Sequence, residues 1–282
     1  MKPAAFDYLR VDSSNEAAHA LAKHGEDARI LAGGQSLMAV LNMRLAQPSL
    51  LIDISRSREL ANVKLEKAAM CIGAAVTQAQ VETRPGLMNE VPLLALAFPY
   101  ISHFQIRNRG TVAGSIAHAD PSAELPLCLL ALEGEVVLRK PRSRRLVKAV
   151  DFFTGMLLTA RLADEFLEEV RFPIATPGTG YGFKEFSMRH GDFAVCAVAA
   201  VAHASGLRIA VGGVADRPTA VNLPLLAGSA LEDALNELAW SLDAKDEPQA
   251  SALLRRQLVR TLGLQAVVQA TAAYNDQKRH AA

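Results

Sequence analysis

The chain has 282 residues, which exceeds the usual size of one compact core and favours two or three smaller domains. Half of the residues are hydrophobic and 21% are charged, so the composition is that of a folded globular protein and excludes a largely disordered chain. With 30 Lys and Arg against 29 Asp and Glu, the net charge is +1, and no overall basic field indicates a nucleic-acid partner.

The cysteines and the N-terminus indicate the cellular compartment. The three cysteines are odd in number and far apart, which argues against a disulfide framework and against a closely spaced metal motif. The N-terminus lacks the apolar stretch of a signal peptide, and the longest apolar run, from Phe193 to Ala202, is too short to cross a bilayer. We therefore expect a soluble, cytoplasmic protein without membrane insertion and without a metal site of its own.

The first sixty residues alternate strands and helices, as in a small βαβ-like unit. The pattern of apolar and polar residues predicts strands over 6–9, 29–32 and 50–54 and helices over 13–24 and 37–45. Ser13, Ser14 and Asn15 offer N-caps to the first helix, and Ser36 can cap the second, because a side-chain oxygen there can accept a hydrogen bond from a backbone N–H of the first turn.

Short strands and helical pieces follow from about residue 62, and this mixture is typical of an α+β domain. The stretch TPGTGYG at 176–182 is rich in Gly, Pro and Thr and predicts a domain boundary. Beyond it, residues 193–203 and 207–211 read as the two strands of a hairpin, and residues 231–274 have a helical composition. We expect an α+β fold in three parts: 1–60, 61–175 and 176–282.

The segment LAGGQSL at 31–37 carries the sharpest local signal. Two glycines follow a predicted strand, and a chain without side chains there can bring several backbone N–H groups close to a phosphate. Ser36, at the start of a helix, adds a hydroxyl group and the positive end of the helix dipole. A tight strand-to-helix turn without a ligand would show the same pattern. The segment lacks the third glycine of a GxGxxG fingerprint and the Gly-Lys-Ser/Thr of a P-loop, which excludes these two nucleotide motifs.

The segment IRNRGTVAGSIAHADPSAELP at 106–126 is a second candidate cradle. Gly110 and Gly114 permit close backbone approach, and Thr111 and Ser115 offer hydroxyl donors. Asp120 or Glu124 could accept a hydrogen bond from a ribose hydroxyl group. A long surface loop with helix caps is the alternative interpretation.

In this order and spacing, the two motifs resemble those of the FAD-binding medium subunits of the xanthine dehydrogenase and carbon monoxide dehydrogenase family of molybdenum hydroxylases. The likeness spans essentially the whole chain and includes KPAAFDY, SLLIDIS and YGFKEFSMRHGDFA. It implies a two-part FAD-binding domain of the vanillyl-alcohol oxidase and CO dehydrogenase flavoprotein type, followed by a smaller C-terminal α+β domain.

In that family the two motifs clasp the FAD diphosphate from two sides. The resemblance implies cofactor contacts from Ala32, Gly33, Gly34, Gln35, Ser36 and Leu37 in the first motif and from Thr111, Gly114 and Ser115 in the second. It assigns Asp120 and Glu124 to the ADP and ribose part of the pattern. Ala113 stands where many relatives have a glycine.

The block YGFKEFSMRHGDFA resembles the stretch where the family presents groups to the isoalloxazine ring. Lys184 would stabilise the negative charge that reduced flavin carries near N1. Phe193 stands where some relatives have Tyr, so the contact implied there lacks a hydroxyl group. A solvent-facing strand residue without a ligand is the alternative for Lys184.

Other polar residues have simpler explanations. His103 and His118 lie at no metal-ligand spacing from other His or Cys residues, so we expect structural or loop roles for them. The basic run RKPRSRRLVK at 139–148 lacks the interleaved aromatic residues of a nucleic-acid site. It predicts an exposed hairpin, which is either solvated or in contact with a partner subunit.

The resemblance implies an oxidoreductase subunit that holds FAD and has no catalytic residue of its own. Electrons would come from [2Fe–2S] clusters in an iron–sulfur small subunit, after hydroxylation at the molybdenum cofactor of a large subunit, and would pass to an external acceptor. A dimer of heterotrimers is the implied assembly. Each cluster normally needs four cysteine ligands, so three scattered cysteines agree with clusters in another chain.

Two other functions fit the same loops. A self-sufficient FAD-dependent oxidase or dehydrogenase would need its own substrate pocket, for which the C-terminal domain is small. A non-catalytic nucleotide-binding scaffold would keep the loops without transferring electrons.

Overall fold

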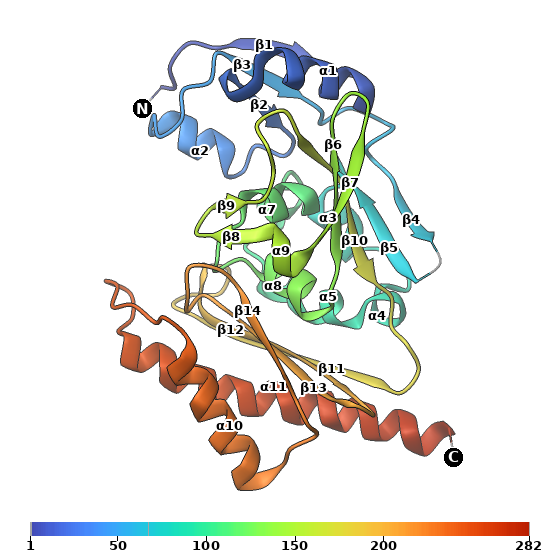
Figure 1. Ribbon diagram of the computed structural model, residues 1–282, viewed down its shortest axis with the longest axis vertical. Coiled ribbons are helices and arrows are strands. Elements are labelled where there is room, and N and C mark those ends of the chain that lie inside the picture. The colour runs from blue at the N-terminus through green and yellow to red at the C-terminus, as the bar shows by residue number, and fades with distance from the viewer. Residues whose placement is uncertain (1, 67, 282) are drawn as a thin grey trace.

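The computed structural model describes the backbone of residues 2–66 and 68–281 and the side chains up to residue 279. Figure 1 shows three units arranged along the longest axis, from the N-terminal unit at the top to the C-terminal helices at the bottom. Among the described residues, no helix combines the length and the apolar character that a membrane span requires.

The first unit contains a three-stranded parallel sheet with the strand order β1-β3-β2. Its elements are β1 (Asp7–Arg10), α1 (Ser14–His24), the 3-10 helix η1 (Gly25–Asp27), β2 (Ala28–Leu31), α2 (Leu37–Asn42) and β3 (Leu50–Asp53). The strands and helices predicted for this region are confirmed. Of the three candidate N-caps, Ser13 caps α1, since its hydroxyl oxygen accepts a hydrogen bond of 3.2 Å from the N–H of Glu16.

The second unit is built on a five-stranded antiparallel sheet with the order β4-β5-β10-β6-β7. Its strands are β4 (Val63–Glu66), β5 (Ala69–Gly73), β6 (Glu135–Arg139), β7 (Arg144–Lys148) and β10 (Phe166–Pro173). The chain between β5 and β6 supplies α3 (Gln78–Glu82), α4 (Leu87–Glu90), α5 (Pro92–Ala97), η2 (Phe98–Tyr100), α6 (Phe104–Arg107), α7 (Val112–His118) and α8 (Glu124–Ala131). The chain from β7 to β10 contains α9 (Ala149–Phe152) and the short hairpin of β8 (Phe153–Gly155) and β9 (Leu158–Thr159). Every residue of α8 is buried, so this helix lies at the centre of the molecule.

The third unit is a four-stranded antiparallel sheet in sequential order with two helices on one face. Its elements are β11 (Thr179–Ser187), β12 (Ala194–His203), β13 (Gly206–Gly212), β14 (Thr219–Leu223), α10 (Gly228–Ser241) and α11 (Ala252–Ala281). The predicted hairpin and C-terminal helices are confirmed. The helix α11 runs along one face of the sheet, and α5 and α8 lie on the other face (Figure 1).

The predicted boundary at 176–182 is only partly a loop, because β11 begins at Thr179. Gly180 and Gly182 lie inside this strand and face α11. A Cβ atom on Gly180 would lie 1.9 Å from the carbonyl oxygen of Ala270, and one on Gly182 would lie 2.1 Å from that of Ala266. These glycines therefore let α11 pack closely on the sheet, and the prediction that they belong to a boundary loop is wrong.

Two hydrophobic cores lie on opposite faces of the C-terminal sheet. Ala197 and Ala199 of β12 belong to the larger core, which continues through the first and second units. Val198 and Ala200 belong to a second core formed with α10 and α11. Successive side chains of a strand point to opposite faces, so alternate residues of β12 enter the two different cores.

The strands β6 and β7 form the hairpin predicted for the basic run, but most of its cationic side chains are paired within the chain. Lys140 lies 2.9 Å from Asp164, and Arg145 lies 2.8 Å from Glu165. The two remaining arginines of the strands, Arg139 and Arg144, share one carboxylate. Paired in this way, the run offers few free cations to a nucleic-acid backbone.

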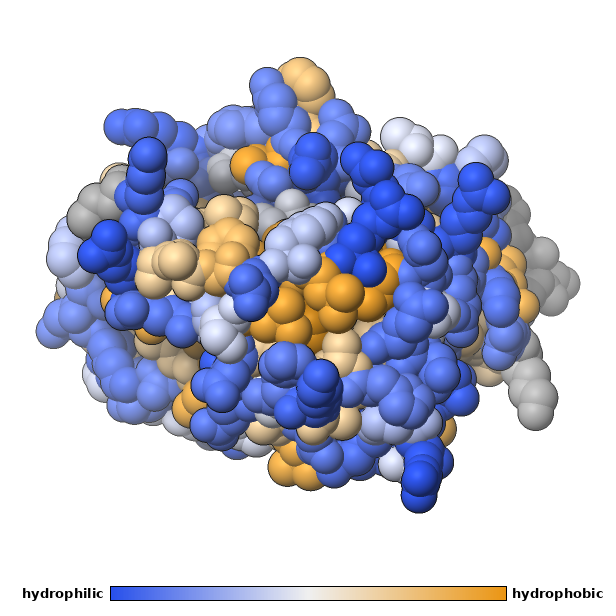
Figure 2. Space-filling view, turned by 90° about the horizontal axis from the view of Figure 1, so that it is seen from above, coloured by the Kyte–Doolittle hydropathy of each residue, from blue (hydrophilic) through white to orange (hydrophobic). Residues whose placement is uncertain are grey.

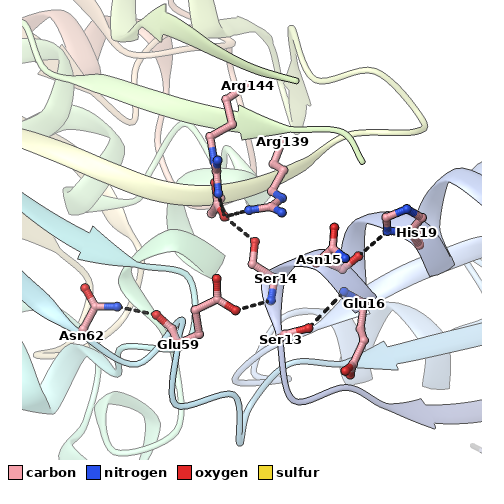
Figure 3. Close-up of polar contacts among 10 residues, drawn as sticks. Ser13, Ser14, Asn15, Glu16, His19, Glu59, Asn62, Arg139 and Arg144 are labelled. Carbon is pink, nitrogen blue, oxygen red and sulfur yellow. Dashed lines mark hydrogen bonds and ion pairs between the residues drawn. The ribbon is translucent and has the colours of Figure 1, made fainter. Parts of the chain in front are cut away.

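That shared carboxylate belongs to Glu168 on β10, which joins the first unit to the second. Figure 3 shows the side chain of Ser14 pointing toward those of Arg139 and Arg144. It accepts hydrogen bonds from the hydroxyl group of Ser14, from Arg139 at 2.7 Å and from Arg144. The N–H of Ser14 donates to Glu59 at 2.9 Å. Because Ser14 is fully buried at the start of α1, the network fixes this helix against the second sheet.

The N-terminal end of the molecule has a mainly hydrophilic surface. Seen from above, polar and charged side chains surround an apolar area near the middle of this face (Figure 2). A surface of this kind is typical of contact with water and is not a broad apolar docking face.

Candidate functional site

The loop after β2 carries the first glycine motif and leaves a row of backbone donors unpaired. Within the described residues, the N–H groups from Gly33 to Leu37 donate to no protein acceptor. Gly34 has a φ of 74°, a left-handed conformation that side chains rarely allow. Successive unpaired N–H groups on a loop form the kind of concave site that anions occupy, so this loop is suited to phosphate.

Side chains of the first motif complete the loop. The amide nitrogen of Gln35 donates to the carbonyl oxygen of Gly33 at 3.1 Å. Ser36 occupies the N-cap position of α2, but its hydroxyl group makes no capping bond, so the predicted side-chain cap is wrong. The hydroxyl group is thereby left for another partner, and a ligand at the loop would provide one.

The two motifs lie against each other, although they are far apart in sequence. A Cβ atom on Gly33 would lie 2.1 Å from the carbonyl oxygen of Arg109 and 2.7 Å from the Cα of Gly110. A Cβ atom on Gly110 would in turn lie 3.5 Å from the Gln35 side chain and 3.6 Å from that of Gln78. The structure therefore brings the two loops into one site, with Gly33 and Gly110 at their contact.

Hydrogen bonds to α3 and its surroundings anchor the second loop. The N–H of Gln78 donates to the carbonyl oxygen of Gly110 at 2.8 Å. The Arg107 guanidinium donates to Glu82 at 2.7 Å and to the carbonyl oxygens of Ile101 and Ser102 at 2.6 and 3.0 Å. Arg107 thus holds the segment before the loop through its Nε and Nη1 groups.

A threonine caps the helix that follows the second loop. The Oγ1 of Thr111 accepts a hydrogen bond of 2.9 Å from the N–H of Gly114. A Cβ atom on Gly114 would lie 2.7 Å from that oxygen, so the glycine protects the cap. Ala113 is buried inside α7 and has no positive φ, so the alanine fits the place where many relatives have glycine. Ser115 lies one residue further along the same helix.

The acidic residues of the second motif follow the end of α7. The chain turns at Ala119, which has a φ of 54°, and the Oδ1 of Asp120 then accepts a hydrogen bond of 2.8 Å from the N–H of Ser122. Glu124 begins α8 and is only 8% exposed. Burial, together with the charge of Asp120, raises the pKa of Glu124 to about 7. Near neutral pH this carboxyl group can therefore donate as well as accept a hydrogen bond.

The structure does not bring Lys184 together with the two loops. Lys184 pairs across the sheet with Val198, a member of the core on the α11 side. Phe193, directly before β12, is 67% exposed. The turn before it lies beside the second loop's entry segment, because a Cβ atom on Gly191 would lie 2.9 Å from the ring of His103. Phe193 is therefore open to a planar ligand, whereas the position of Lys184 gives no support to a flavin contact.

Sequence reasoning missed two residues around the site: Gln78 and Arg107. Gln78 is 6% exposed, and its side-chain oxygen has no partner among the described residues. It directly follows Thr77, which forms a capping box with Gln80. The Thr-x-x-Gln pattern could have indicated from the sequence that a helix begins here and holds Gln78 in a fixed position. Arg107 stands inside the second motif, where only its guanidinium contacts reveal its role.

The described residues offer no other cofactor site of a familiar type. The three cysteines, Cys71, Cys128 and Cys196, are buried and form no disulfide bond. In the part of the chain that the structure describes, no group of three or more His, Cys, Asp or Glu side chains is placed to hold a metal ion. The two contacting loops are thus the candidate site.

Two loops that close on each other, with unpaired backbone donors and hydroxyl groups, are typical of a protein that binds a cofactor through its diphosphate. The chain belongs to the family of the FAD binding domain in molybdopterin dehydrogenase, whose model matches residues 4–175.

Three relatives illustrate the likeness. The chain is 38% identical over 275 residues to the 6-hydroxypseudooxynicotine dehydrogenase complex subunit alpha of Paenarthrobacter nicotinovorans, with 93% of each chain covered. It is also 38% identical over 284 residues to the nicotine 6-hydroxylase medium subunit of that organism, covering 96% of this chain and 99% of the relative. A solved structure of carbon monoxide dehydrogenase from Hydrogenophaga pseudoflava matches with a TM-score of 0.92 at 32% identity, covering 97% and 99%. The family, the fold and the FAD cofactor expected from the sequence are confirmed.

Proposed function

We propose that this chain is the FAD-carrying electron-transfer subunit of a heteromeric molybdenum hydroxylase. The contact of Gly33 with Arg109 and Gly110 carries the proposal, because it joins the unpaired donors of residues 33–37 and the Thr111 cap into one site. A diphosphate bears negative charge and needs such a set of converging N–H and O–H donors.

The donors of the site divide among the parts of FAD. The diphosphate would take hydrogen bonds from the backbone of Ala32 to Leu37 and from the hydroxyl groups of Ser36, Thr111 and Ser115, while Gly114 allows its close approach. Asp120 and Glu124 would bind ribose hydroxyl groups. Phe193 would lie against the ring system, whereas the contact of Lys184 has the least support because of the face it occupies.

When bound, FAD supplies the redox chemistry, since a flavin exchanges electrons both in pairs and singly. The residues of this chain hold and orient it. We assign residues 1–60 and 61–175 to two FAD-binding parts and residues 176–282 to a C-terminal domain, in agreement with the separate sheets of these regions.

We further propose that the partners are an iron–sulfur small subunit and a molybdenum large subunit, assembled as a dimer of heterotrimers in the cytoplasm. The relatives named as a complex subunit and as a medium subunit support a multi-subunit enzyme. The three cysteines of this chain are buried in different elements, so cluster ligands are expected from another chain.

The test is to purify the chain alone and together with the products of neighbouring genes that encode iron–sulfur and molybdenum subunits. Both preparations are assayed for dye reduction with nitrogen heterocycles, aldehydes and carbon monoxide. We expect bound FAD in both and substrate-dependent turnover only in the complex. Turnover by the isolated chain would favour the self-sufficient flavoenzyme, and a chain without FAD would favour the scaffold.

A further inference from the structure

Gln78 lies at the point where the two cofactor loops meet. Its N–H donates to the carbonyl oxygen of Gly110 at 2.8 Å. A Cβ atom on Gly110 would lie 3.6 Å from the carboxamide carbon of Gln78 and 3.5 Å from the Cγ of Gln35. The side chains of Gln78 and Gln35 therefore lie on the same side of Gly110, and Gly110 itself packs on Gly33 of the first loop.

The backbone around Gln78 is held in place on both sides. Thr77 pairs with Thr111 of the second motif in a short antiparallel bridge. Thr77 also forms the capping box with Gln80, which fixes the start of α3. Because its backbone is held and its side chain is only 6% exposed, Gln78 has little conformational freedom left to lose when a ligand binds.

The two ends of the Gln78 carboxamide have different surroundings. The oxygen is buried and has no hydrogen-bond partner among the described residues. The nitrogen likewise donates to no acceptor in the described part of the chain, but it is not buried, so the small exposed area of this residue includes its N–H groups. An amide held with its oxygen inward thus offers two unused N–H donors to a ligand that fills the site.

We propose that Gln78 is an FAD-binding residue, and that its side-chain amide donates a hydrogen bond to an oxygen of the cofactor diphosphate. This inference rests on the proposed function and adds a donor from the start of α3 to those of the two motifs. A phosphate oxygen is the acceptor that fits, because the other groups at the contact of the loops are also N–H and O–H donors and a diphosphate is negatively charged.

Three variants test the contact through two quantities. One is the FAD affinity of the full-length chain freed of FAD, measured by flavin fluorescence quenching, and the other is the melting temperature without FAD. Gln78→Met removes the donor, so FAD affinity falls about tenfold. It also removes the unpaired oxygen, so the melting temperature stays level or rises. Gln105→Met makes the same change at an exposed site on α6 and leaves both quantities unchanged.

Gln78→Glu identifies the group of FAD that the amide contacts. A carboxylate beside the diphosphate repels it, so this variant binds FAD more weakly than Gln78→Met near neutral pH. As the pH falls and the new carboxyl group takes up a proton, it becomes a donor, and its affinity rises relative to that of the natural protein. A contact with a cofactor hydroxyl group would instead leave the affinity of Gln78→Glu natural, because a carboxylate accepts from a hydroxyl group.

Unchanged FAD affinity in Gln78→Met, or natural affinity in Gln78→Glu, would overturn the proposal. Weaker binding in Gln78→Met together with a lower melting temperature would also overturn it, since the side chain would then act only by supporting the second loop. If the natural protein binds no FAD, the proposed function itself fails, which is a distinct result.

Discussion

Gly33 in the first unit packs directly on the carbonyl oxygen of Arg109 in the second, so closely that a Cβ atom at residue 33 would lie 2.1 Å from that oxygen. No side chain fits in such a contact, so the packing of one loop on the other requires glycine at residue 33. This requirement is independent of any role of Gly33 in phosphate binding. Because the contact makes one site from two loops, a change in either loop is expected to affect the bound cofactor.

Gly33→Ala is expected to separate the loops. The added methyl group meets backbone atoms, which cannot rotate away as a flexible side chain can, so the stability loss should be about 1–3 kcal/mol. FAD affinity should fall at least about tenfold, because the donors of the two loops no longer converge. Equilibrium denaturation and FAD titration measure the two effects, and retention of the natural affinity would contradict the loop assignment.

Gly34→Ala tests the left-handed turn, and Gly178→Ala is its matched control. Both glycines have a φ of 74°, and a Cβ atom on Gly178 would meet nothing within 4 Å. Each alanine should cost about 1–2 kcal/mol of backbone strain. Only Gly34→Ala should weaken FAD binding. Equal FAD affinities in the two variants would show that the first loop does not belong to the FAD site.

Thr111→Val should destabilise α7 and release FAD together. The half-buried N–H of Gly114 loses its acceptor, at a cost of about 1 kcal/mol. Ser13→Ala removes a comparable cap from α1, which lies outside the two loops. We expect similar losses in melting temperature from the two variants and weaker FAD binding in Thr111→Val alone. Weaker binding in both would show that general loss of stability, and not the cap, controls the cofactor.

Glu168→Gln should weaken the junction of the first two units by about 2 kcal/mol, since Arg139 and Ser14 lose a buried charged acceptor. Burial alone would raise the pKa of Glu168, but hydrogen bonds from Arg144, Ser14 and Arg139 outweigh it and lower the pKa below 4.5. The Glu168 carboxylate therefore stabilises the folded protein at pH values above its pKa in the unfolded chain. This stabilisation is lost as the pH falls through its lower pKa in the folded protein.

Urea denaturation at about pH 7 and about pH 3 checks this prediction, with the difference between Glu168→Gln and the natural protein shrinking in acid. Asp216→Asn is the control, because its ion pair with Lys245 is exposed and screened by water, so its loss should change the stability little at either pH. A difference for Glu168→Gln that is the same at both pH values would rule out the paired carboxylate as its cause.

Glu185 should make the FAD-free protein less stable as the pH rises. Burial and Glu124 raise its pKa from 4.5 to about 9, so the unfolded chain loses this proton long before the folded chain does. Stability is then highest below pH 4.5 and falls until about pH 9, by at most about 1.4 kcal/mol per pH unit. Glu185→Gln lacks this loss, so its advantage over the natural protein should grow across the window in guanidinium denaturation. A constant difference would mean that Glu185 is not neutral when folded.

Local signals determined the order of elements and the family. The Ser13 cap, the glycine pair after β2 and the hairpin of β12 and β13 all depend on residues close together in the chain. For the same reason the two cofactor motifs could be recognised, since each is a continuous segment whose backbone freedom and hydroxyl groups are visible in its letters.

The tertiary structure alone decided which of these residues meet and which way they face. Gly180 and Gly182 looked like loop residues until α11 was seen packed on them, and the basic hairpin looked like a charged surface until acids from β10 and its preceding turn were seen to pair with it. Lys184 and Glu185 are neighbours in the sequence but enter opposite cores. The contact of Gly33 with Arg109, likewise, joins segments from different units. Close approach and facing depend on strand register and on the packing of distant elements, and neither is encoded within a short stretch of chain.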